Sequence, residues 1–71
     1  SAQMRLGMMY EYGRGVPPDP TLAYQWYSLA ASQNHTHAKE RREIIKKKMS
    51  ASQISEAEDL IEEWKRNLNS K

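Results

Sequence analysis

The chain has 71 residues, enough for one small domain, and 38% of them are hydrophobic. It contains no cysteine, which excludes disulfide bonds within the chain. With only two histidines and no cysteine, it offers few ligands for a zinc ion that could stabilise so small a core. The 11 basic and 9 acidic residues give a net charge of +2, and no segment is long and apolar enough to cross a membrane.

Residues 2–13 are predicted to form the first helix. The residues that recur there at intervals of three and four are Ala2, Leu6, Met9, Tyr10 and Gly13. Gly7, in the middle of this segment, costs a helix about 1 kcal/mol relative to alanine, so we expect an aromatic ring or another helix to approach it closely. Gly13 and Gly15 then end the helix, because glycine adopts left-handed backbone conformations readily, and Pro17 prevents its continuation.

A second helix is predicted to begin after Asp19, whose carboxylate can accept hydrogen bonds from the first backbone amides. Pro20 suits the first helical position, where no donor is needed. The residues expected on its buried stripe are Ala23, Trp26, Tyr27, Ala30 and Ala31. Asn34 is expected to end the segment in a left-handed conformation. With no phenylalanine in the chain, we expect Trp26 to be buried between the helices.

These residues resemble the Sel-one-like repeat, a relative of the tetratricopeptide repeat, over Ala2 to Ala38. The matching positions are Leu6 to Tyr10, Gly13 to Val16, Asp19, Ala23, Trp26, Tyr27, Ala30 and Ala31. Asn34 stands where the family usually has glycine. The resemblance implies an all-α fold, an α-solenoid fragment of about four antiparallel helices, in which residues 1–34 are one helix-pair repeat. Because the chain starts with Ser1 and Ala2 directly on the first helix, without an initiator methionine, we interpret it as a piece of a longer repeat protein.

Residues 35–71 depart from the repeat pattern and are interpreted as a divergent C-terminal capping helix pair. Ala38, Ile45 and Met49 predict a thin apolar stripe on the first helix of this pair. Ser50 and Gln53 have the spacing of a capping box, and Met49 and Ile54 that of a hydrophobic staple. The buried face of the last helix is expected to comprise Ile54, Ala57, Leu60, Ile61, Trp64 and Leu68. This segment resembles the ending that often follows the last repeat in bacterial members of the family.

Charge is separated along the second half of the chain. Residues 39–48 carry six basic and two acidic residues, whereas residues 56–63 carry five acidic residues and no basic one. One interpretation places the two segments on neighbouring antiparallel helices, where opposite charges stabilise each other. The other is a basic strip that contacts nucleic acid or an acidic partner. No aromatic residue is interspersed with these bases, which disfavours nucleic acid.

No enzyme motif is present. The chain lacks a cysteine nucleophile, a Gly-x-Ser-x-Gly turn and a phosphate-binding loop of the Walker type. His35 and His37 could hold a metal only with further ligands from elsewhere. We therefore predict neither catalytic residues, nor a metal, nor a cofactor.

The resemblance implies a non-catalytic scaffold or adaptor that binds another protein or a peptide, in a bacterial cytoplasm or periplasm. By analogy with tetratricopeptide relatives, the first helix of each unit lines the concave surface. Carried over by position, this gives the candidate partner-binding residues Met4, Met8, Glu11, Tyr12, Ile44, Lys47 and Lys48. Met8 and Tyr12 also lie four residues apart and off the main buried stripe.

Two other interpretations of these residues and of the domain remain. Met4 and Met8 could instead fill the contact to a preceding repeat. The domain could also be purely architectural, as a terminal cap of a longer repeat protein or as a module that self-associates.

Overall fold

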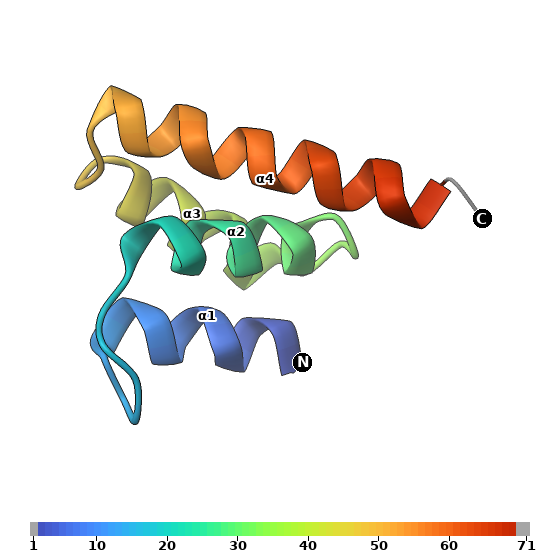
Figure 1. Cartoon of the computed structure of the whole chain (residues 1–71). Helices are drawn as coiled ribbons and strands as arrows, with labels where there is room; N and C mark the ends of the chain where they lie inside the picture. Colours follow the sequence, from blue (N-terminus) through green and yellow to red (C-terminus); the bar gives the residue numbers. More distant parts are fainter. Residues whose placement is uncertain (1, 70–71) are drawn as a thin grey trace.

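The computed structural model describes the backbone of residues 2–69 and the side chains of residues 2–67. In this part of the chain there are four helices and no strand: α1 (Ala2–Tyr12), α2 (Pro20–Ala31), α3 (Thr36–Lys46) and α4 (Ala51–Asn69). Figure 1 shows them in chain order. The all-α fold and the four helices predicted from the sequence are confirmed. No helix in the described residues is both long and apolar enough to span a bilayer.

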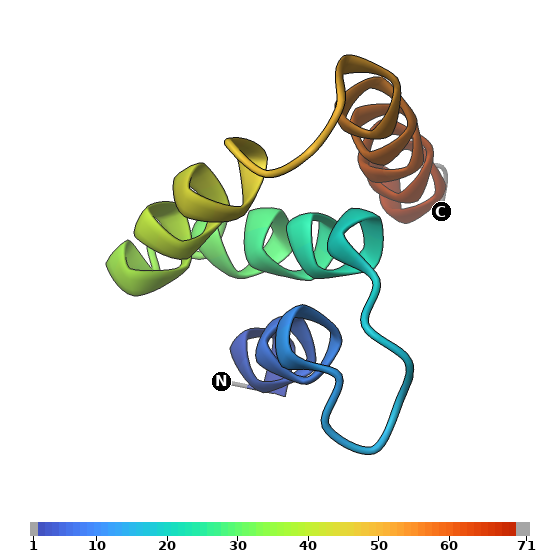
Figure 2. The same ribbon diagram turned by 90° about the vertical axis from the view of Figure 1, so that its left-hand side faces the viewer.

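Helix α2 is the centre of the molecule. It packs against α1, α3 and α4, whereas α3 and α4 make few contacts with each other. Figure 2 shows α3 and α4 diverging from each other over α2, with α1 below α2. The basic and acidic segments therefore do not lie on two directly packed helices.

The contact between α1 and α2 depends on a glycine. Tyr27 is fully buried, and a Cβ atom built on Gly7 would lie 2.6 Å from two carbons of its ring. Such a distance is far inside van der Waals contact, so only glycine lets the ring lie this close to the α1 backbone. The close approach predicted at Gly7 is confirmed.

The turns and N-caps predicted at Gly13, Asp19 and Asn34 are present in the structure. Gly13 and Asn34 have φ angles of 69° and 66°, in the left-handed region expected for both. Asp19 is the N-cap of α2 and accepts a hydrogen bond from the Leu22 amide at 3.2 Å. His35 is the N-cap of α3, where its Nδ1 accepts from the Ala38 amide at 3.4 Å.

Helix α4 begins with the predicted capping box. The Gln53 amide donates to Ser50 Oγ at 3.1 Å, and the Ser50 amide donates to Gln53 Oε1 at 3.0 Å. Met49 is buried and Ile54 packs against the same hydrophobic cluster, as a staple requires. The capping box thus fixes the start of α4.

Three expected core residues are not in the core. Trp26 and Trp64 are only partly buried, and Leu60 is 36% exposed. The side chain of Leu68, also expected on the buried face, lies outside the described residues.

Tyr24 and Leu29 are buried instead, although neither belongs to the predicted stripe of α2. The reason is that α2 is contacted from three sides, so its buried residues extend around the helix. Helix α4 meets it mainly through Ala57 and Ile61, which leaves Leu60 at the margin of the contact.

Candidate partner-binding surfaces

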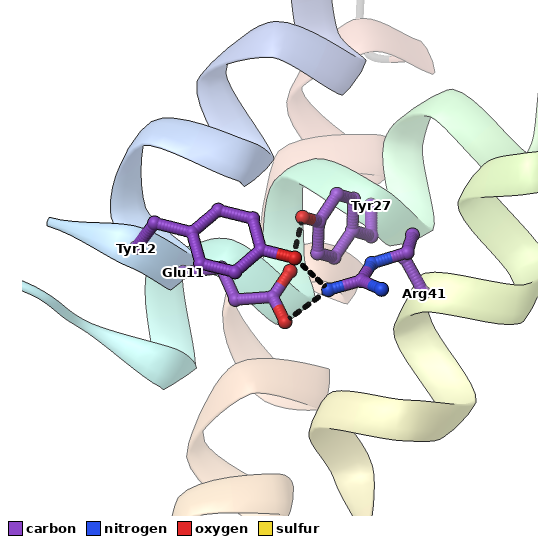
Figure 3. A network of polar contacts seen from close by, with 4 residues as sticks. All are labelled: Glu11, Tyr12, Tyr27 and Arg41. Carbon is purple, nitrogen blue, oxygen red and sulfur yellow. Dashed lines mark hydrogen bonds and ion pairs between the residues drawn. The ribbon is translucent and has the colours of Figure 1, made fainter. Parts of the chain in front are cut away.

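A polar cluster joins three helices beneath the predicted binding face (Figure 3). The Tyr27 hydroxyl on α2 donates a hydrogen bond to Glu11 Oε1 on α1 at 2.5 Å. Arg41 Nη2 on α3 donates to Glu11 Oε2, also at 2.5 Å. The Glu11 side chain is only 6% exposed, so its charge needs a partner within the molecule, and the Arg41 guanidinium supplies it. The cluster links α1 to both α2 and α3.

The electrostatics of this cluster favour one protonation state at neutral pH. Burial raises the pKa of the Tyr27 hydroxyl well above its usual 10.0, and the hydrogen bond to Glu11 and its negative charge raise it further. The hydrogen bond to Glu11 also raises the pKa of Arg41. A neutral phenol and a guanidinium cation therefore both donate to one carboxylate.

Tyr12 extends this cluster to the molecular surface. Its hydroxyl accepts a hydrogen bond from Arg41 Nη2, and the Arg41 guanidinium lies 5.6 Å from the centre of its ring. The Arg14 guanidinium lies 5.9 Å from the same ring. Tyr12 is nevertheless 50% exposed. The hydrogen bond from Arg41 therefore orients the Tyr12 hydroxyl, while half of the ring remains exposed to solvent.

The seven predicted site residues fall into two groups. Met8 (39% exposed) and Ile44 (41% exposed) are large apolar side chains open to solvent, as is Tyr12, and Lys47 and Lys48 are exposed beside Ile44 in sequence. The other two stabilise the fold: Met4 packs against both hydrophobic clusters, and Glu11 holds Arg41 and Tyr27. Of the exposed five, Met8 and Tyr12 lie on α1, Ile44 lies on α3, and Lys47 and Lys48 follow α3 directly. We call these five residues the α1–α3 face.

A second surface feature was not identified from the sequence. It is a groove of about 570 Å³, which has its floor on α2 and its two walls on α3 and α4. Lys39 and Arg42 line it from α3, and Glu58, Glu62 and Lys65 line it from α4. The sequence feature that corresponds to this groove is the pair of oppositely charged segments, the basic residues 39–48 and the acidic residues 56–63. Which side chains of each block share a space depends on how α3 and α4 pack on α2.

Comparison with known proteins shows what the first half of the chain is similar to. Residues 1–35 match the family model of the Sel1 repeat. A stretch of 42 residues, 59% of this chain, is 48% identical to chitin synthase regulatory factor 3 of the fission yeast Schizosaccharomyces pombe. The matched stretch corresponds to 4% of that protein's length. No solved structure matches the chain.

Proposed function

Because residues 1–35 form a Sel1 repeat, we propose that this chain is a non-catalytic interaction module that binds a partner protein or peptide through the α1–α3 face. Sel1 repeats generally mediate protein–protein interactions. The observation that supports this face is the position of Tyr12, a half-exposed ring whose hydroxyl accepts a hydrogen bond from Arg41. A ring fixed before binding loses little conformational entropy when a partner covers it.

The composition of the face fits this role. Tyrosine, methionine and arginine are enriched in protein interfaces, and the rim around the apolar centre is polar and solvent-accessible. Met8 lies one helical turn before Tyr12 on α1, while Ile44 lies one turn after Arg41 on α3. Arg41 contacts Tyr12, so the two helices bring their exposed apolar side chains to the same side of this contact. A partner with an apolar anchor and acidic flanks suits such a surface.

Binding to nucleic acid receives less support. Arg41 is paired with Glu11, and Lys39 and Arg42 line a groove that also contains Glu58 and Glu62. The basic residues of α3 are thus divided between different surroundings rather than gathered on one strip. A nucleic-acid site needs its cations aligned along the phosphate backbone.

The regulatory role named for the fission-yeast relative is compatible with a module that acts by binding. That protein is far longer than this chain, so its activity is not transferred. The bacterial origin expected from the resemblance also stays a prediction, since this relative is a fungal protein.

A random linear peptide library displayed on phage tests the proposal directly. We expect enriched peptides to bind the unaltered chain and to lose at least about tenfold in affinity against the Met8→Ser, Ile44→Ser double variant. Leu60→Ser is the matched control, because Leu60 is similarly exposed but lies on α4. Selection of no peptide, or equal loss in both variants, would contradict this assignment.

The architectural alternative is tested by sedimentation of the same proteins. A monomer that binds peptide supports the interaction module. A concentration-dependent dimer that the Met8→Ser, Ile44→Ser variant abolishes would show that the face serves self-association instead.

A further inference from the structure

One arginine beside Tyr12 has no carboxylate partner. Arg41 is paired with Glu11. Arg14 is exposed and, among the side chains that the structure describes, it forms no ion pair. Its guanidinium lies 5.9 Å from the centre of the Tyr12 ring. The edge of the α1–α3 face therefore carries a positive charge that the fold itself does not neutralise.

The backbone keeps Arg14 close to the end of α1. Gly13, which precedes it, has a φ angle of 69°, and a Cβ atom built there would lie 2.7 Å from Pro18 Cγ. The loop thus packs tightly on itself at this point. The Arg14 amide donates a hydrogen bond to the Met9 carbonyl at 3.0 Å. Because the backbone of Arg14 is anchored, a ligand would have to order only its side chain.

The Tyr12 hydroxyl supplies a hydrogen-bond donor beside this cation. It accepts from Arg41 Nη2, and a phenol that accepts a hydrogen bond still has its own proton to donate. In the part of the chain that the structure describes, no acceptor takes this proton. An oxygen atom that accepted it would lie close to the Arg14 guanidinium, since that group is 5.9 Å from the centre of the same ring.

The remaining charges of α1, α3 and their loops do not cancel that of Arg14. Of the acidic residues before α4, Glu11 and Glu43 form ion pairs with arginines, and Asp19 is the N-cap of α2. Glu40 is exposed, but it directly precedes Arg41 and therefore points about 100° away from it around α3. The exposed basic residues on α1 and in the segments that follow α1 and α3 are Arg5, Arg14, Lys47 and Lys48. This side of the molecule has an excess of positive charge, which favours an acidic ligand.

We propose that Arg14 and the Tyr12 hydroxyl bind the side-chain carboxylate of an aspartate or glutamate in the partner segment, an inference that rests on the function proposed for the α1–α3 face. The carboxylate accepts one hydrogen bond from the hydroxyl and one or two from the guanidinium. Its single charge matches that of Arg14. A phosphate group would bring further negative charge close to Glu11.

The acidic residue lies within the partner segment rather than at its end. Helices α1 and α3 run in the same general direction, each opposite to α2 (Figure 1). On their solvent-facing side, Met8 lies one turn before Tyr12 on α1, whereas Ile44 lies one turn after Arg41 on α3. A segment that covers Met8 and Ile44 therefore extends past Tyr12 in both directions, with apolar residues on either side of the carboxylate.

Peptides selected on the unaltered chain from the random linear library test this inference. We expect them to carry an enriched aspartate or glutamate, and its replacement by asparagine or glutamine should weaken binding at least about tenfold. Arg14→Gln in the chain should cause a similar loss. The two changes together should cost no more than one alone, because both remove the same contact. Arg66→Gln is the matched control, since Arg66 is also exposed but lies on α4.

The outcomes separate this inference from the function on which it rests. Peptides that depend on Met8 and Ile44 but bind the Arg14→Gln chain as tightly as the unaltered one would overturn the carboxylate site and leave the interaction module standing. Equal loss in the Arg14→Gln and Arg66→Gln chains would also overturn it, because overall charge would explain the effect. Tyr12→Phe keeps the ring and removes the donor, so unchanged affinity in that chain would overturn the part assigned to the hydroxyl. Selection of no peptide would overturn both proposals.

Discussion

Gly7 lies directly against the ring of Tyr27, so close that a Cβ atom at this position would be 2.6 Å from two ring carbons. Tyr27 is fully buried among residues of α2, α3 and α4, and its hydroxyl is fixed by Glu11. The ring therefore has no space to move aside. This contact allows α1 and α2 to pack closely.

Replacement of Gly7 by alanine is expected to destabilise the fold. The gain in helix propensity is about 1 kcal/mol, whereas overpacking a rigid contact costs about 1–3 kcal/mol or more. We expect a net decrease in the free energy of unfolding, measured by urea denaturation. Met8→Ala, at the neighbouring exposed position, should change it little. A Gly7→Ala protein more stable than the unaltered chain would show that the ring yields.

Glu11→Gln should also destabilise the chain, by about 1–3 kcal/mol. The substitution preserves size but removes the charge that compensates Arg41 and accepts from Tyr27. Glu40→Gln, an exposed carboxylate on α3, is the control for the change in net charge. Thermal denaturation of the two variants provides the comparison, and equal melting temperatures would argue against a stabilising role for the cluster.

Stability should decrease in alkaline solution. The pKa of Tyr27 is raised in the folded state above its usual value of 10.0, and burial, the charge of Glu58 and its hydrogen bond raise the pKa of Tyr24 too. Their contribution to folding is therefore fully present below about pH 10 and is lost as the pH rises through the folded-state values.

Tyr27→Phe tests this pH dependence. The free energy of unfolding, measured by urea denaturation at a series of alkaline pH values, should fall less steeply in this variant than in the unaltered chain. Tyr10→Phe, outside the polar cluster, is the control. Identical slopes in all three proteins would be incompatible with a raised pKa at Tyr27.

The capping box gives a prediction for α4. Ser50→Ala removes the oxygen that accepts from the Gln53 amide and should cost about 0.5–2 kcal/mol. Ser52→Ala, inside the helix and exposed, should be neutral or slightly stabilising because alanine favours helices. Urea denaturation of the pair separates capping from a general effect of serine removal, and an equal change in both would exclude the cap as the cause.

Trp26 and Tyr27 should differ in their importance although they are adjacent. Tyr27→Ala removes a fully buried ring, which costs about 3–5 kcal/mol and can abolish folding of so small a domain. Trp26 is only partly buried, so Trp26→Ala should cost less and leave a cooperative transition. Circular dichroism during heating measures both. A Trp26→Ala chain without a cooperative transition would contradict this ranking.

Local signals in the sequence were sufficient to predict four helices and most of their ends, although not the N-cap of α3 at His35. The caps at Asp19 and Ser50 and the turns at Gly13 and Asn34 depend on neighbouring residues alone, and the spacing of apolar residues gives helical periodicity. The need for a close aromatic contact at Gly7 could also be anticipated, because a glycine inside a helix costs stability unless its small size is used.

The three-sided burial of α2 could only be found in the tertiary structure. It decided that Tyr24 and Leu29 are buried while Trp26 and Leu60 are not, because burial depends on which neighbours cover each side of a helix. The ion pair of Glu11 with Arg41, thirty residues apart, and the groove between α3 and α4 arise from the same packing. A pattern of residues specifies which faces of a helix are apolar, whereas the angles at which helices meet determine which charges lie together.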